Sequence, residues 1–118
     1  MNAENLREYC QNKREVTEGF PFNDTALVFK VAGKMFALLN LDDPLGISLK
    51  CDPEKAIELR EHHPCVFPAY HFNKKHWNTI YIDGSVNDDL IFQWIDHSYQ
   101  KVVEKLPKKD RLRILGEV

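Results

Sequence analysis

The sequence lacks several features that would assign it to a function class directly. It has no apolar run near the roughly 20 residues that cross a bilayer. Its first residues, MNAENLREYCQNKRE, hold no apolar segment typical of a signal peptide. The three cysteines, Cys10, Cys51 and Cys65, are odd in number and form no CxxC pair, which favours free thiols over a disulfide framework. We therefore predict a cytoplasmic protein with no membrane partner.

Catalytic sequence motifs are also missing. The five glycines occur singly, so no Gly-rich phosphate loop is predicted, and neither GxSxG nor HExxH is present. His62 and His63 project about 100° apart at a predicted helix end, which does not suit a pair of zinc ligands. Cys65 activated by His71 or His76 is one possible nucleophile, and an inert buried thiol is the simpler interpretation. The sequence predicts no catalytic residue, no metal and no cofactor.

The composition is that of an ordinary globular protein. The chain has 118 residues, of which 43% are hydrophobic and 29% are charged. This length predicts a single domain over residues 1–118. The formal net charge of −2 argues against a broad positive field, so any contact with nucleic acid must come from a local patch.

The first half of the chain predicts a helix followed by strands. Residues 4–16 place apolar side chains at helical spacing, and Gly19 and Pro21 end this pattern. The runs TALVFKVAG and KMFALLNL then read as two strands, which a tight hairpin at Ala32-Gly33 joins. A third strand, GISLKC, follows.

The second half predicts a helix, two strands and a long helix. Asp52 is expected to cap the helix PEKAIELREHH, with Pro53 in its first turn. CVFPAYHF and HWNTIYIDG read as strands, and Pro68 places the first of them near an edge or a bulge. Asn87 or Asp88 caps the long helix, and KKDRLRILGEV is expected to add one helical turn. This order predicts an α+β fold, with an antiparallel sheet of about five strands and helices on one face.

Strand alternation predicts which side chains face away from the helices. Assigning the aliphatic positions to the core leaves lysines and aromatic residues on the open face: Lys30, Lys50, Thr79, Tyr81 and, as a further candidate, Trp77. Ammonium groups pair with phosphates and rings stack on bases, so this face suits nucleic acid. The alternative is that the lysines are the solvated half of the alternation and that Trp77 is partly buried packing.

Positive charge also collects at the end of the long helix. Residues 101–113 contain six lysines and arginines but only two acidic residues, Glu104 and Asp110. Cations near a helix C-terminus are favoured by about 0.3–1 kcal/mol each, which explains some of them without a partner. A phosphate-binding role is the alternative.

Four blocks of the sequence resemble the MmcQ/YjbR family of small bacterial proteins. They are GKMFALL (33–39), ISLKCDPEKAIELRE (47–61), NKKHWNTIYIDG (73–84) and DHSYQKVVEKLPKK (96–109). The likeness runs over nearly the whole chain, and NKKHWNT is its most specific element. It implies a CyaY-like or frataxin-like α+β fold and a non-enzymatic DNA-binding protein with a "double wing" arrangement.

The frataxin likeness also raises iron handling, which is associated with an acidic helical ridge. We do not expect it here, because Glu4, Glu8 and Glu15 alternate with basic residues along the first segment.

The resemblance and the predicted open face together define a candidate site for DNA. Lysines would contact phosphates, with His76 as a further candidate, and Trp77 and the asparagines would stack or form hydrogen bonds. The predicted residues are Lys30, Lys50, Asn73, Lys74, Lys75, His76, Trp77 and Asn78. The alternative is a protein-interaction or small-ligand module centred on Trp77 and Tyr81.

Overall fold

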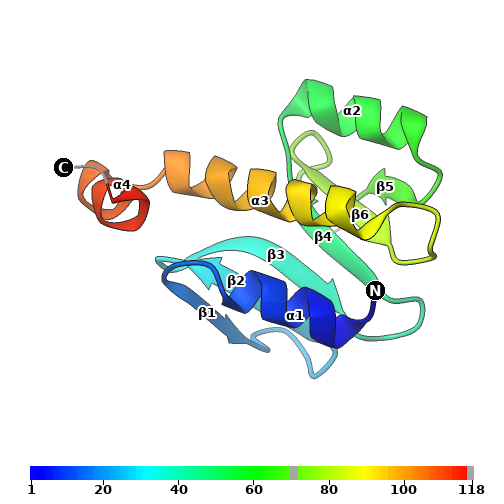
Figure 1. The fold of residues 1–118 in the computed structure, drawn as a ribbon, viewed down its shortest axis with the longest axis horizontal. Coiled ribbons are helices and arrows are strands. Elements are labelled where there is room, and N and C mark those ends of the chain that lie inside the picture. The colour runs from blue at the N-terminus through cyan, green and yellow to red at the C-terminus, as the bar shows by residue number, and fades with distance from the viewer. Residues whose placement is uncertain (70–71, 117–118) are drawn as a thin grey trace.

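The computed structural model describes residues 1–69 and 72–116, which form an antiparallel sheet with helices on one face (Figure 1). The sheet has six strands in the order β1-β2-β3-β4-β6-β5. The strands are β1 (Val16–Gly19), β2 (Ala26–Val31), β3 (Lys34–Asn40), β4 (Gly46–Lys50), β5 (Val66–Pro68) and β6 (Trp77–Tyr81). The helices are α1 (Ala3–Gln11), α2 (Pro53–His62), α3 (Asp88–Glu104) and α4 (Lys108–Leu115). The predicted α+β class is confirmed.

The N-terminal region differs from the prediction by one strand. The predicted helix over 4–16 is too long, because α1 ends at Gln11. Glu15 then adopts a φ of 57°, in the left-handed region, and the chain turns into the edge strand β1. β1 pairs with β2, with Val16 opposite Val31.

Several predicted turns and caps are confirmed. Ala32 and Gly33 have φ angles of 48° and 84°, so both central residues of the β2–β3 hairpin are left-handed, as a type I′ turn requires. Asn87 caps α3 by accepting the N–H of Leu90 at 3.2 Å. Pro68 lies at the end of the edge strand β5.

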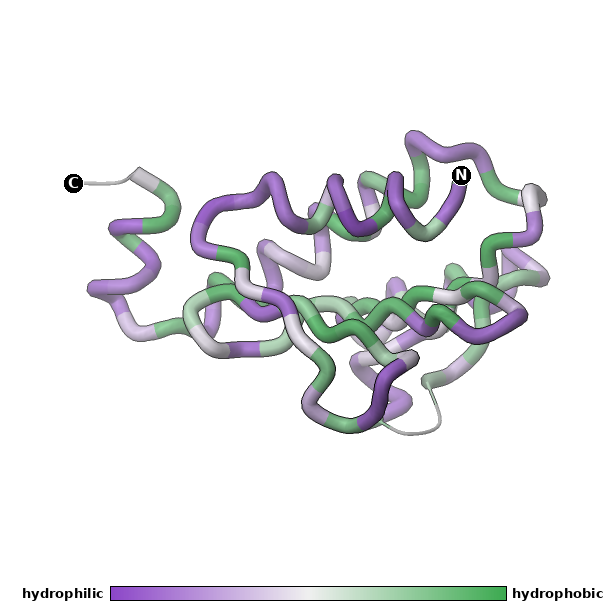
Figure 2. The backbone as a smooth tube through the Cα atoms, turned by 90° about the horizontal axis from the view of Figure 1, so that it is seen from below, coloured by the Kyte–Doolittle hydropathy of each residue, from purple (hydrophilic) through white to green (hydrophobic). Residues whose placement is uncertain are grey.

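The core lies between the sheet and the helices, which occupy the same side of it (Figure 2). The aliphatic positions assigned to the covered face are buried, with Phe29 and Ile47 at 0% exposure. α3 contributes Ile91, Trp94 and Ile95 to the core. Trp94, not Trp77, is therefore the buried indole of the core.

The longest helix ends beyond the sheet. The C-terminal part of α3 extends past β3 toward α4, which forms two turns of helix where one had been predicted (Figure 1). Across residues 1–69 and 72–116, none of the helices combines the length and apolarity needed to cross a membrane.

Candidate functional site

A hollow of about 520 Å³ lies at the end of the sheet, where β4 ends and β6 begins. Lys50 and Trp77 stand directly opposite each other in the β4–β6 pairing, so both side chains leave the same face of the sheet. The start of α2, the turn before β6 and the overhanging end of α3 form its other walls. We call this hollow the strand-end groove; it is lined by Lys50, Cys51, Asp52, Pro53, Asn73, His76, Trp77, Lys101, Glu104 and Lys105.

The NKKHWNT block builds one wall of the groove through a hydrogen-bonded turn. The carbonyl of Asn73 accepts the N–H groups of His76 and Trp77, both at 3.0 Å. The side-chain oxygen of Asn73 also accepts the N–H of Lys75 at 3.0 Å, which is an Asx turn. Lys74 and Lys75 are exposed at the tip, and His76 and Trp77 line the groove. Four of the predicted site residues, Lys50, Asn73, His76 and Trp77, therefore converge.

Helix α2 holds this turn from behind. The guanidinium of Arg60 donates to the carbonyl of Lys74 at 3.1 Å and to the side-chain oxygen of Asn78 at 2.8 Å. The amide of Asn78 donates in turn to the carbonyl of Ala56 at 3.1 Å. Asn78 is 1% exposed and points toward α2. The last asparagine of the block is thus an anchor of the fold that does not line the groove, although the sequence included it among the DNA contacts.

The charges of the groove are partly paired. Lys101 contacts Asp52 at 2.9 Å and Glu104 at 3.5 Å. The hydrogen bond from Lys101 lowers the pKa of Asp52 and raises the pKa of Lys101. Asp52 occupies the N-cap position of α2 but accepts no capping hydrogen bond, so its predicted capping role is wrong: its carboxylate binds Lys101 instead. Within the described part of the chain, Lys50 and Lys105 form no ion pair.

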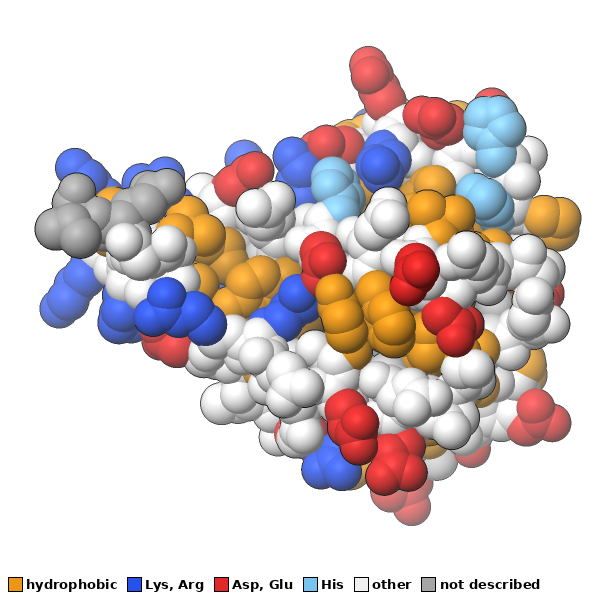
Figure 3. All heavy atoms as spheres, in the orientation of Figure 1, with side chains coloured by type: hydrophobic (Ala, Val, Ile, Leu, Met, Phe, Trp, Pro, Cys, Tyr) orange, Lys and Arg blue, Asp and Glu red, His pale blue; other side chains and the backbone are white. Residues whose placement is uncertain are grey.

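Basic residues continue from the groove onto α4. In Figure 3, Lys and Arg side chains gather at the end of the molecule that carries α4, and acidic side chains lie over the other half of the visible face. Arg113 is neutralised by Glu15 and Asp110, at 2.7 and 2.8 Å. Lys108 and Lys109 are exposed and form no ion pair with any described residue. An overall acidic molecule therefore carries one basic end.

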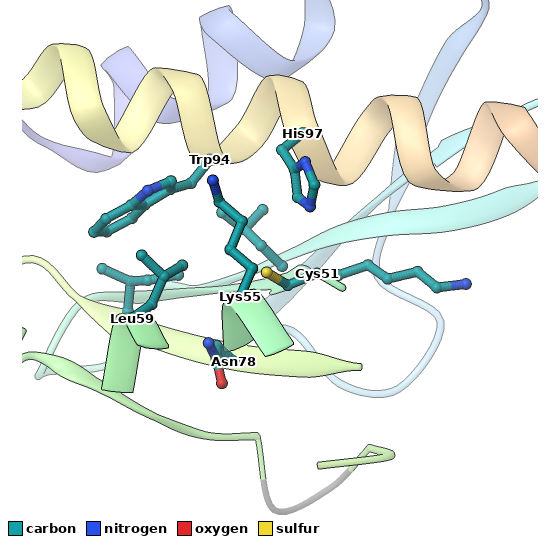
Figure 4. Close-up of a pocket in the computed structure, with 9 residues that line it drawn as sticks. Cys51, Lys55, Leu59, Asn78, Trp94 and His97 are labelled. Carbon is teal, nitrogen blue, oxygen red and sulfur yellow. The ribbon is translucent and has the colours of Figure 1, made fainter. Parts of the chain in front are cut away.

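Behind the groove, a cavity of about 10 Å³ lies between α2, α3 and the sheet, which is room for about one water molecule. Figure 4 shows Lys55 of α2 extending between Trp94 and His97 of α3. The Nε2 atom of His97 is buried, has no hydrogen-bond partner among the described residues and lies 3.9 Å from Asp52. Burial, and then the charge of Lys55, lower the pKa of His97.

The remaining predicted residues lie elsewhere. Lys30 lines a separate hollow of about 350 Å³ together with Phe20 and Val28. β3 lies between the strands of Lys30 and Lys50, which separates their backbones by about 10 Å. Tyr81 packs edge-on against a neighbouring ring and lines a third hollow, of about 80 Å³. Trp77 and Tyr81 therefore line different hollows.

The fold shields the thiols from solvent. Cys10, Cys51 and Cys65 are all buried. Burial raises the pKa of Cys10 to about 12 and that of Cys51 to about 11, so both are protonated at neutral pH. His71, the base considered for Cys65, lies outside the described residues.

Sequence reasoning did not include the α3 residues Lys101, Glu104 and Lys105 in the site. Their charges were interpreted as helix-end stabilisation, with phosphate binding as the alternative, and were not connected to Lys50 or Trp77. A signal was present, because Lys101 and Lys105, the C-cap residue of α3, are four residues apart and so lie on the same side of the helix end.

Comparison with known proteins gives consistent matches. The YjbR family model matches residues 11–101. The uncharacterised protein YjbR of Escherichia coli K12 is 37% identical over 112 residues, which cover 94% of this chain and 95% of the relative. The uncharacterised protein YbdF of Escherichia coli O157:H7 is 36% identical and covers 80% of this chain and 79% of its own length.

Solved structures show the same fold. The crystal structure of a Deinococcus radiodurans protein with the DUF419 family domain has a TM-score of 0.90 and 41% identity, and the match covers 96% of this chain and 87% of the other. The crystal structure of a Pseudomonas syringae protein has a TM-score of 0.75 and 29% identity, with coverage of 86% and 98%.

Proposed function

This chain belongs to the YjbR family, and on that premise we propose that it is a non-enzymatic DNA-binding protein whose strand-end groove and helix α4 contact phosphates. The observation that carries the proposal is the concentration of positive charge. Residues 101–113 hold six lysines and arginines against two acidic residues in a chain of net charge −2. This segment adjoins Lys50 and His76 across the groove. Such a local basic surface is the electrostatic footprint of a nucleic-acid binder.

An extended polyanion fits this surface better than a single small anion does. Lys50 and Lys105 lie on the groove, whereas Lys108 and Lys109 lie on the next helix. None of these four lysines is neutralised by a described carboxylate. Cations spread in this way can reach successive phosphates of a strand. With about four such contacts, we expect modest affinity that depends strongly on salt.

A titration of labelled DNA tests the proposal. Duplex and single-stranded DNA are titrated with the full chain by fluorescence anisotropy at about 50 and about 200 mM salt. Four phosphate contacts predict an affinity loss of about 100-fold between these two concentrations. Absence of salt-sensitive binding to both forms at micromolar protein would contradict the proposal.

A further inference from the structure

We infer that the strand-end groove takes one unpaired nucleotide of a single DNA strand, with the base against Trp77 and the phosphate against Lys50 and Lys105. This inference rests on the proposed DNA binding and specifies the form of DNA that the groove recognises.

The size and shape of the groove favour an unpaired nucleotide. Its volume of about 520 Å³ is within the range of small-ligand sites, about 300–1,000 Å³. A base in a duplex is stacked inside the helix and reaches such a hollow only after it is unpaired and flipped out. A single strand exposes its bases without that step.

The position of the Trp77 ring suits stacking on a base. It is half-buried and lines the groove. Its ring packs against Phe72, with the ring centres 5.1 Å apart and the planes at 32°. Its backbone is held by the carbonyl of Asn73. A ring fixed in this way loses little conformational freedom when a base stacks on it.

The groove around Trp77 offers cations for the phosphate of a nucleotide and carboxylates for its base. Lys50, directly across the strand pair, and Lys105 of α3 are the unpaired cations of the groove among the described residues. Asp52 and Glu104 line the same hollow and would repel a bare phosphate backbone along that wall. Carboxylates also accept hydrogen bonds from base N–H groups. The groove therefore suits a phosphate joined to a base, and a duplex is left with the lysines of α4.

Substitutions of Trp77 separate these two modes of binding. The full chain and its Trp77→Ala, Trp77→Phe and Phe67→Ala variants are titrated with a labelled single strand and with a duplex of the same sequence. Phe67 is the matched control, because it is an aromatic residue 43% exposed on β5 that does not line the groove. Thermal unfolding by circular dichroism verifies that each variant is folded.

The inference predicts that Trp77→Ala weakens single-strand binding by about 5- to 100-fold, the range that one stacked base contributes. Duplex binding should change by less than about twofold, and Trp77→Phe and Phe67→Ala should retain most single-strand affinity. The strand should quench tryptophan emission in the native chain but not in Trp77→Phe, where Trp94 is the remaining indole.

Three results would overturn the inference. The first is an unchanged single-strand affinity in Trp77→Ala, and the second is an equal loss for strand and duplex. The third is binding of a free nucleoside monophosphate as tightly as the strand, which would assign the groove to a small molecule. In the first two cases salt-sensitive DNA binding remains and the proposed function stands, whereas loss of binding to both DNA forms in the native chain would remove both proposals.

Discussion

The hydroxyl of Ser98 donates to the carbonyl of Phe36 at 2.5 Å and accepts the N–H of Lys50 at 2.8 Å. The direct pairing of β3 with β4 reaches only as far as Ala37 and Leu49. Beyond that pair the two strands are bridged by a side chain of α3. Ser98 is fully buried, so this bridge holds the end of β4, where Lys50 enters the strand-end groove.

Ser98→Ala should lower the free energy of unfolding by about 1–3 kcal/mol, because it removes the hydrogen-bond partner of the buried Phe36 carbonyl and of the partly buried N–H of Lys50. Urea denaturation measures this change. Ser85→Ala is the control, since Ser85 bonds Asp83 on the exposed surface and should change stability by about 0.5 kcal/mol or less. Equal effects of the two substitutions would contradict the bridging role of Ser98.

Arg60→Met should also destabilise the protein by about 1–3 kcal/mol, because the buried side-chain oxygen of Asn78 and the carbonyl of Lys74 lose their donor. Lys55→Met on the same helix is the matched control, because Lys55 is exposed and makes no hydrogen bond or ion pair with a described residue. If both variants have the same urea midpoint of unfolding as the native chain, Arg60 does not anchor the turn.

Much of the fold was predictable because hydrophobic periodicity is a local property. The alternation of Leu27, Phe29 and Val31 identified β2 and its buried face, and all three are buried as predicted. β1 was missed because its four residues, VTEG, show no alternation of apolar and polar side chains. Its pairing with β2 defines it as a strand. The end of α1 was missed because nothing in the local pattern signals the left-handed Glu15.

The candidate site was predictable only in part, because it depends on strand register and helix position. The opposition of Lys50 and Trp77 follows from β4 pairing with β6, which are separated in the sequence by α2 and β5. The contribution of Lys105 requires α3 to overhang the sheet. Asn78 lies between Trp77 and Thr79 on β6, so strand alternation alone would place it on the covered face, whereas the NKKHWNT motif placed it among the DNA contacts. Its burial agrees with the alternation.

His97 should make stability fall in mild acid. Its pKa is lowered in the folded state by burial and by Lys55 and Lys101, against the opposite effect of Asp52 and Glu104. Between the folded pKa and the unfolded value of about 6.5, the unfolded chain binds more protons, so stability is lost as pH falls below about 6.5.

Urea denaturation at about pH 7.5 and about pH 5.5 measures this effect. The native chain should lose more stability between these values than His97→Gln does. His62→Gln, at an exposed position, should behave like the native chain. A His97→Gln profile that follows the native one would show that His97 does not titrate as described.

The cysteines should resist alkylation in the folded protein. The pKa values of Cys10 and Cys51 are raised to about 12 and about 11 by burial, and Cys65 is 2% exposed. A thiol reagent at neutral pH should label the native chain slowly and all three thiols rapidly in urea, as mass spectrometry would show. Rapid labelling of Cys51 in the native protein would mean that the groove opens to expose it.

The central claim is that the strand-end groove binds phosphates. The most direct test is the salt dependence of DNA binding by a double variant that carries both Lys50→Gln and Lys105→Gln. We expect log affinity for single-stranded DNA to fall with log salt at a slope of about −2.8 for the native chain, from about four phosphate contacts, and at about −1.4 for the double variant. Arg7→Gln, which removes a positive charge from α1 outside the groove, should keep the native slope. The same slope for the double variant and the native chain would contradict phosphate binding in the strand-end groove.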